Sequence, residues 1–166
     1  MIPLSYLFER SLKTFGDPNR VNAPMIAWSV YHQKPPPFIW PNLPEHPKGI
    51  WKGLKVDKVI PTNALNQLEA IEEIKGTSSC QGTLTKEGGE KEVPTYFIFR
   101  PNNQDRSYCE SITSKLNRFP RTRAGYGMGN AGKYRICVIG DMSYETDPRG
   151  FTQWWNALPK RIRASL

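Results

Sequence analysis

The stretch that decides the fold begins at Thr95-Tyr96-Phe97-Ile98-Phe99 and ends just beyond the pair Trp154-Trp155. Residues 95–99 form a short apolar run that is typical of a buried strand, and residues 134–139 form a second one. Apolar residues at helical spacing follow each run: Tyr108, Ile112, Leu116 and Phe119, then Phe151, Trp154, Trp155 and Leu158. This order predicts an α/β fold, with α+β as the alternative, in which helices pack on a small mixed sheet.

The last helix of this stretch has recognisable boundaries. Asp147 is a good N-cap residue, and Pro148 fits the first helical position, where its missing N–H costs nothing. Pro159 lacks the donor that an interior helical position needs, so we expect it to kink or break the helix and leave a basic tail behind it.

Upstream of residue 95 the patterns are shorter. Apolar residues at spacings of three and four predict a helix over residues 4–15, and the apolar run at 25–31 predicts a strand. The segment 34–50 is rich in proline, which excludes a helix and predicts an extended arm.

Three further elements are expected between this arm and residue 95. A short strand is predicted over residues 54–60, and a helical stripe runs from Ala64 to Ile74. Thr62 or Asn63 is expected to cap this helix and Gly76 to end it. Residues 77–92 are typical of a hairpin or loop that turns at two glycines.

Length and composition indicate a single domain over residues 1–166 with no membrane partner. A chain of 166 residues can bury a core, and it holds no apolar stretch long enough to span a bilayer. The cysteines Cys80, Cys109 and Cys137 are odd in number and far apart, which favours the cytoplasm or another reducing compartment.

Positive charge is concentrated in the C-terminal third. Residues 111–166 contain 10 Lys and Arg against 3 Asp and Glu, within a chain of net charge +8. No acidic residue lies between Glu110 and Asp141, and this interval contains the glycine-rich run 124–132. A local positive field attracts polyanions, and glycines let backbone amides approach phosphates.

These features predict a basic glycine-rich loop over residues 118–135 that binds RNA or single-stranded DNA. In this interpretation cations contact phosphates and two tyrosines stack on bases. The candidate binding residues, with the basic tail included, are Lys115, Arg118, Arg121, Arg123, Tyr126, Lys133, Tyr134, Arg135, Lys160, Arg161 and Arg163. Two simpler readings stay open, namely a mobile soluble loop and a contact with an acidic protein.

Residues Gly127 to Lys133 match part of a phosphate-binding P-loop, G-x-x-x-x-G-K. The next residue is Tyr134, where Mg²⁺ coordination needs Ser or Thr. The glycines also precede an expected strand, whereas a P-loop opens a helix. We therefore expect no nucleotide hydrolysis.

The sequence predicts no catalytic set, metal site or cofactor. Asp57, Glu73 and Lys75 could imitate the charged set of a nuclease, but Glu73 and Lys75 would point to different faces of a helix. His32 and His46 do not stand at ligand spacing from a cysteine, which argues against zinc.

A cluster of three acidic residues follows the predicted strand at 134–139. Asp141, Glu145 and Asp147 could hold Mg²⁺, although a turn and a helix cap explain Asp141 and Asp147 equally simply. We therefore lean against an enzyme.

Large aromatic residues suggest protein contacts instead. Adjacent residues of a helix point about 100° apart, so one of Trp154 and Trp155 is expected to be exposed. The candidate interface residues are Phe38, Trp40, Trp51, Trp154 and Trp155.

The leading hypothesis is a non-catalytic nucleic-acid-binding or nucleoprotein-assembly subunit. The alternative is a structural subunit of a larger assembly such as a viral or phage particle, in which case the protein would reside in the virion. An enzyme that acts on nucleic acid ranks third.

Overall fold

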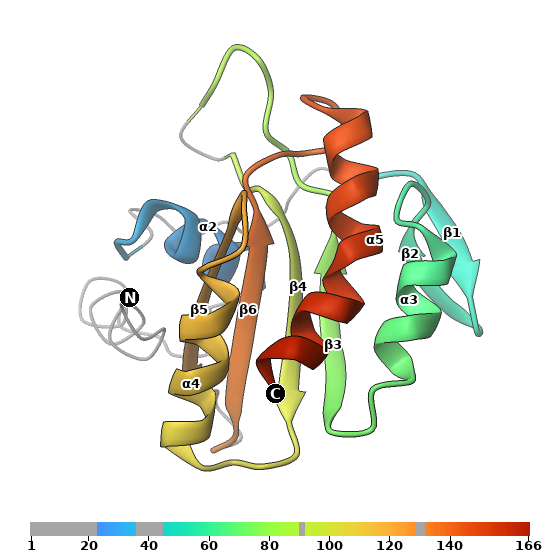
Figure 1. The fold of residues 1–166 in the computed structure, drawn as a ribbon. Helices are drawn as coiled ribbons and strands as arrows, with labels where there is room; N and C mark the ends of the chain where they lie inside the picture. The colour runs from blue at the N-terminus through green and yellow to red at the C-terminus, as the bar shows by residue number, and fades with distance from the viewer. Residues whose placement is uncertain (1–22, 36–44, 90–91, 129–131) are drawn as a thin grey trace.

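A four-stranded antiparallel sheet with helices on both faces forms the body of the protein. The computed structural model describes residues 23–35, 45–89, 92–128 and 132–166. The strand order is β3-β4-β6-β5, and a separate two-stranded sheet lies beside β3 (Figure 1). The expected small sheet with helices packed on it is therefore confirmed in its α+β form, and the pairings between the described strands are antiparallel.

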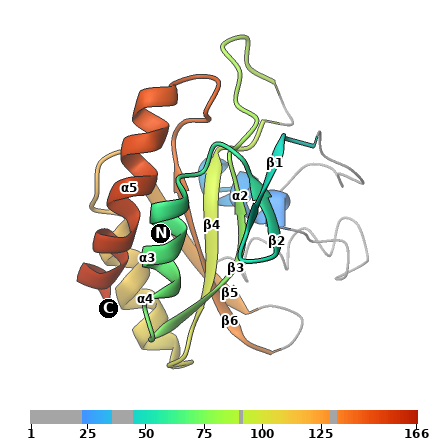
Figure 2. The same ribbon diagram turned by 90° about the vertical axis from the view of Figure 1, so that its right-hand side faces the viewer.

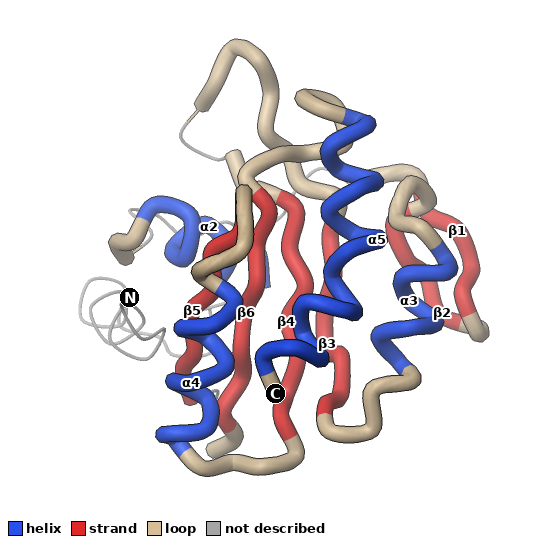
Figure 3. Tube along the Cα trace, viewed as in Figure 1, coloured by secondary structure: helices blue, strands red, loops and turns tan. Residues whose placement is uncertain are grey.

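Along the described chain, single helices alternate with pairs of strands (Figure 3). The strands of the main sheet are β3 (Ile74–Cys80), β4 (Thr95–Pro101), β5 (Thr122–Met128) and β6 (Tyr134–Gly140). The helices are α2 (Ala23–His32), α3 (Thr62–Glu69), α4 (Arg106–Leu116) and α5 (Pro148–Ser165). The small sheet pairs β1 (Lys48–Trp51) with β2 (Leu54–Asp57).

Three helices, α3, α4 and α5, cover one face of the main sheet (Figure 2). They bury the alternate residues of the strands that point toward them, among them Phe97, Phe99 and Ile136. Trp155 of α5 is fully buried in this core, and its indole N–H donates to Thr95 Oγ1 at 2.9 Å. This larger core fixes the positions of β4, β5 and β6.

Helix α2 packs on the opposite face of the sheet, where a strand had been predicted over residues 25–31. That prediction is wrong because Met25 to Val30 are all buried, so the run shows no polar face from which its period could be recognised. Pro24 lies in the first turn of the helix, where a proline is tolerated.

The expected glycine-rich loop at 118–135 is mostly a β-hairpin. Residues 122–128 are β5, which pairs with β6 in continuous register from Thr122↔Gly140 to Met128↔Tyr134. The P-loop match therefore runs from the end of β5 to the residue before β6, so it is followed by a strand and not by the helix whose N-terminus binds phosphate in a P-loop. Glycines usually weaken strands, which is why this run had predicted a loop.

The helix predicted up to Gly76 ends earlier, at Glu69. Pro61 occupies the N-cap position without a side-chain hydrogen bond, so neither Thr62 nor Asn63 is the cap. Gly76 lies inside β3. Ile71 and Ile74 are buried in the same core as the helix, and so their spacing imitated another helical turn. The predicted strand at 54–60 is confirmed only over β2, and the predicted hairpin at 77–92 is the β3–β4 connection, although its first strand reaches Cys80.

Helix α5 begins as predicted, because Asp147 accepts the N–H of Gly150 at 3.0 Å and Pro148 is the first helical residue. It continues through Pro159 to Ser165, so the expected break and basic tail are wrong. Close packing also shapes its approach to the sheet. A Cβ at Gly140 would lie 2.9 Å from the Trp154 ring, so only glycine fits there without movement.

Some predictions lie outside the described residues, namely the helix at 4–15 and the part of the arm at 36–44 with Phe38 and Trp40. In the described parts of the chain, every helix is too short or too polar to cross a bilayer.

Candidate nucleic-acid interface

The cations predicted to act together are divided between two ends of the β5–β6 hairpin. Arg118, Arg121 and Arg123 lie at or near the start of β5, whereas Lys133 and Arg135 lie at the start of β6. The seven residues of β5 separate these ends by roughly 20 Å. The five cations therefore do not form one compact cluster.

Arg121 is committed to ion pairs within the protein. Its Nε and Nη1 lie 2.6 Å from Asp141 Oδ1 and from Asp147 Oδ2, respectively. The hydrogen bond from Arg121 holds the pKa of Asp147 below its ordinary value, with the Gly150 N–H as the next cause. This arrangement joins the start of β5 to the start of α5, and it gives Asp141 and Asp147 a shared guanidinium partner.

Arg123 and Tyr126 are also engaged. Arg123 Nη1 donates to the Tyr31 carbonyl at 2.5 Å, and its guanidinium lies 5.4 Å from the Tyr31 ring centre. Tyr126 is buried, and its hydroxyl donates to Glu110 Oε1. Tyr126 therefore offers no free face to a base, contrary to the prediction, while the neighbouring Tyr134 is half-buried.

The remaining candidate cations belong to the helical side of the sheet. Lys115 and Arg118 lie at the end of α4, and Lys160 and Arg163 project from α5, all four exposed. Arg161 is partly buried, with its guanidinium 5.2 Å from the Phe119 ring centre. These residues lie on or next to α4 and α5, which pack on the face of the sheet opposite to α2.

The structure brings Arg135 together with two cations that the sequence analysis did not assign to binding. Lys75 of β3 is paired with Arg100 of β4. Arg100 and Arg135 come one residue beyond the Phe99↔Ile136 pair, so they face each other on β4 and β6. We call Lys75, Arg100 and Arg135 the basic row; on its far side Gly127 of β5 pairs with Arg135.

The basic row lies on the same face of the sheet as α2. Side chains alternate along a strand, and Ile98 and Cys137, two residues from Arg100 and Arg135, pack against α2. Lys75 is exposed, and Arg100 and Arg135 are half-buried. Within the described residues, no hydrogen bond or ion pair involves these three side chains, and the Nε atoms of both arginines are buried without a partner.

The acidic residues at this end of the sheet have other neighbours. Asp105 caps α4 by accepting the Ser107 N–H, and Glu110 accepts from Tyr126 and pairs with Arg106. Burial, and after it the charge of Glu73, raises the pKa of Tyr108 on α4, and among the described residues Glu73 forms no ion pair with Lys75. The positive charge of the basic row is thus not neutralised by these groups.

Pairs of like charge directly opposite each other destabilise antiparallel strands. A run of three such cations on adjacent strands, about 4.8 Å apart, therefore costs stability unless an anion lies across it. Sequence spacing could not reveal this set, because strand register decides which residues of β3, β4 and β6 become neighbours. The signal available in the sequence was limited to Arg135.

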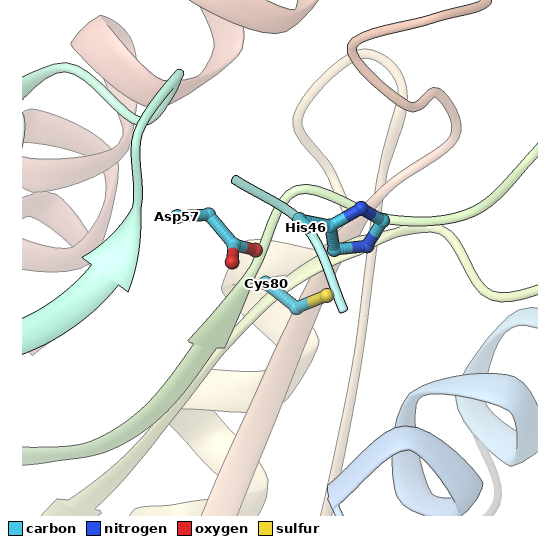
Figure 4. Close-up of side chains that lie close together, drawn as sticks. All are labelled: His46, Asp57 and Cys80. Atoms are coloured by element: carbon cyan, nitrogen blue, oxygen red, sulfur yellow. The ribbon is translucent and has the colours of Figure 1, made fainter. Parts of the chain in front are cut away.

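A second grouping missed by the sequence analysis is His46, Asp57 and Cys80 (Figure 4). One ligand atom from each lies within 4.8 Å of the other two. No spacing rule connects these residues, because they come from three separate segments of the chain. Glu73 and Lys75 do not join Asp57 there, since they lie at the opposite end of β3.

The tryptophans predicted to form a protein interface are used largely within the chain itself. Trp154 and Trp155 are both buried within this chain, so the expectation that one is exposed is wrong. Thr122 and Thr95 accept their indole N–H groups. Trp51 is half-buried and donates to Asn66 Oδ1. Exposed apolar side chains occur instead on the β1–β2 hairpin, at Ile50 and Leu54.

Comparison with protein-family models, with curated proteins and with solved structures finds no match to this chain.

The engagement of Arg121 leads to a specific expectation for Arg121→Ala. We expect the free energy of unfolding to fall by about 1 kcal/mol near neutral pH, since the ion pairs are partly exposed, with little change in nucleic-acid affinity. Because the pKa of folded Asp147 is lowered, its share of this stability is present above the ordinary carboxylate pKa and is lost at lower pH, below about pH 4.

The measurement is chemical unfolding of both proteins at neutral and acidic pH. Equal stability at neutral pH would contradict a structural role for Arg121. A large loss of nucleic-acid affinity without a loss of stability would return Arg121 to the binding surface.

Proposed function

We propose that this chain is a non-catalytic nucleic-acid-binding or nucleoprotein-assembly subunit that holds single-stranded RNA or DNA by its phosphates at the basic row. The observation that carries the proposal is the alignment of Lys75, Arg100 and Arg135 across three adjacent strands with no acidic partner among the described residues. Lys133, exposed just before β6, extends this surface.

Phosphate is the anion that suits these residues best. An arginine guanidinium presents a planar fork of donors that matches two phosphate oxygens, and it stays charged at any ordinary pH. A flexible single strand can place successive phosphates along the row, and each contact releases condensed counterions. The net charge of +8 adds long-range attraction for a polyanion.

The proposal also limits the kind of recognition. Tyr126 is buried and hydrogen-bonded, so it does not supply the stacking platform that single-strand binders use to hold bases. Phosphate contacts position a strand but carry no sequence information. We therefore expect affinity with little preference among base sequences.

The test is binding of labelled oligo(U) and oligo(dT) over a series of salt concentrations. Three phosphate contacts to a single strand correspond to a slope of about −2 when log K is plotted against log salt. A slope near zero, or absence of binding at low salt, would contradict the proposal. A comparable affinity for a polyglutamate peptide would point to an acidic protein partner instead.

A structural subunit of a larger assembly is the second candidate, because Ile50 and Leu54 are 71% and 60% exposed on the β1–β2 hairpin. Light scattering before and after nuclease treatment separates the two candidates. Particles that shrink with nuclease support the nucleic-acid proposal. A defined oligomer that contains no nucleic acid and resists nuclease supports the assembly alternative.

A further inference from the structure

His46, Asp57 and Cys80 meet where the β1–β2 hairpin joins the main sheet. His46 precedes β1, Asp57 is the last residue of β2, and Cys80 is the last residue of β3. Figure 4 shows the three side chains at this junction, and one ligand atom from each lies within 4.8 Å of the others. The three residues therefore bring together segments of the chain that are distant in sequence.

We propose that His46, Asp57 and Cys80 form a zinc site that fastens the β1–β2 hairpin to the edge of the main sheet. An imidazole nitrogen, a carboxylate oxygen and a sulfur are all zinc ligands. Bonds of 2.0–2.3 Å in a tetrahedral arrangement place ligand atoms about 3.5 Å apart. Closing the observed separations to that value needs side-chain movements of about an ångström.

The backbone around the three side chains is already fixed. The Lys58 N–H donates to the Pro47 carbonyl at 2.9 Å, which holds the segment after His46 against the end of β2. The Gln81 N–H donates to Asp57 Oδ2 at 2.7 Å, which joins β2 to the end of β3. The ligands therefore approach one another because the hairpin is docked, before any ion binds.

Backbone geometry also prepares the sulfur of Cys80. The Gly82 N–H points to the sulfur at 3.4 Å. Gly82 has φ +89°, and a Cβ there would lie 2.6 Å from the Thr95 nitrogen, so the turn requires glycine. An N–H donor at this position stabilises negative charge on a metal-bound thiolate. Zinc binds cysteine as the thiolate, so binding displaces the thiol proton.

Lys48 completes the charge balance of the site. Asp57 is 2% exposed, and the Lys48 ammonium neutralises its Oδ1. The Lys48 side chain is 41% exposed, so it can swing into solvent when another cation approaches. Zinc with one thiolate and one carboxylate is neutral overall, and a water molecule at the fourth position completes the coordination. Lys48 thus competes with the metal for the same carboxylate.

If Lys48 competes with zinc, loss of a ligand should weaken zinc binding and loss of Lys48 should strengthen it. The full chain is freed of metal with a chelator and titrated with Co²⁺ and then Zn²⁺. We expect one Co²⁺ per chain with a sulfur-to-metal charge-transfer band, and a higher melting temperature with Zn²⁺. Cys80→Ser should remove the band, and His46→Ala should weaken zinc binding by more than about tenfold.

Two further variants control for unfolding and for binding elsewhere. Cys137→Ser alters another buried cysteine and should keep the band. Lys48→Met should bind zinc more tightly than the wild type and be less stable without it. Absence of the band in the wild type, its persistence in Cys80→Ser, or unchanged zinc affinity in the folded His46→Ala variant would overturn the proposal.

Discussion

Replacing Trp155 by alanine is expected to lower the free energy of unfolding by about 4 kcal/mol. Trp155 is fully buried on α5, with its ring 6.2 Å from Phe97 and 6.3 Å from Phe151 between ring centres. The substitution removes these contacts and leaves a cavity. It also removes the hydrogen bond to Thr95 Oγ1, whose hydroxyl in turn donates to the Cys80 carbonyl.

Thermal and chemical unfolding measure this effect, and a 4 kcal/mol loss corresponds to a decrease of roughly 10 °C in melting temperature. Gln153→Ala is the matched control, because Gln153 is exposed on the same helix and alanine favours helices. Trp155→Phe should cost less, since it keeps an aromatic ring. A Trp155→Ala protein as stable as the control would show that α5 does not pack on the sheet as described.

The second large effect is expected from a triple variant of the basic row, Lys75→Gln, Arg100→Gln and Arg135→Gln. If each side chain contributes about 1 kcal/mol to phosphate binding, the variant should bind oligo(U) roughly 100-fold more weakly. It should also be at least as stable as the wild type, because three neighbouring like charges have been removed. A stable variant that no longer binds has therefore lost its phosphate contacts and not its fold.

A charge-matched control isolates the position of these cations from their number. Lys115→Gln, Lys160→Gln and Arg163→Gln together remove the same charge from the exposed surfaces of α4 and α5. We expect this control to reduce affinity by less than about tenfold through the weaker long-range field alone. Equal losses of affinity in the two variants would show that net charge, and not the position of the basic row, determines binding.

The sequence predicted β4, α4, β6 and the start of α5 because these elements have clear periods or boundaries. The strands at β4 and β6 are short apolar runs, and the helices between and after them keep apolar residues at helical spacing. The start of α5 was predicted from Asp147 and Pro148 alone. These local signals agree with the tertiary structure, so no long-range information was needed.

The predictions for α2 and β5 were wrong for opposite reasons. Helix α2 is buried over Met25 to Val30, so hydrophobicity carried no period. Strand β5 contains Gly125 and Gly127, which locally favour a loop, but its pairing with β6 overrides that preference. In both cases tertiary contacts, and not local propensity, determine the secondary structure.

The candidate binding surface was predicted only in outline. The positive C-terminal third drew attention to Arg135, which belongs to the proposed surface, but it also included Arg121 and Arg123, which the fold uses for its own contacts. Lys75 and Arg100 were not assigned to binding because both lie far in sequence from the basic C-terminal third. Only the register of β3, β4 and β6 makes them neighbours of Arg135.

Photo-crosslinking with an oligonucleotide that carries 4-thiouridine tests the central claim most directly, because it locates the bound strand without altering the protein. Cross-linked residues are identified by mass spectrometry after digestion. We expect them in β3, β4 and β6 around Lys75, Arg100 and Arg135, with the yield falling as salt is raised. Cross-links confined to α4 and α5, or none above the level of a heat-unfolded sample, would contradict binding at the basic row.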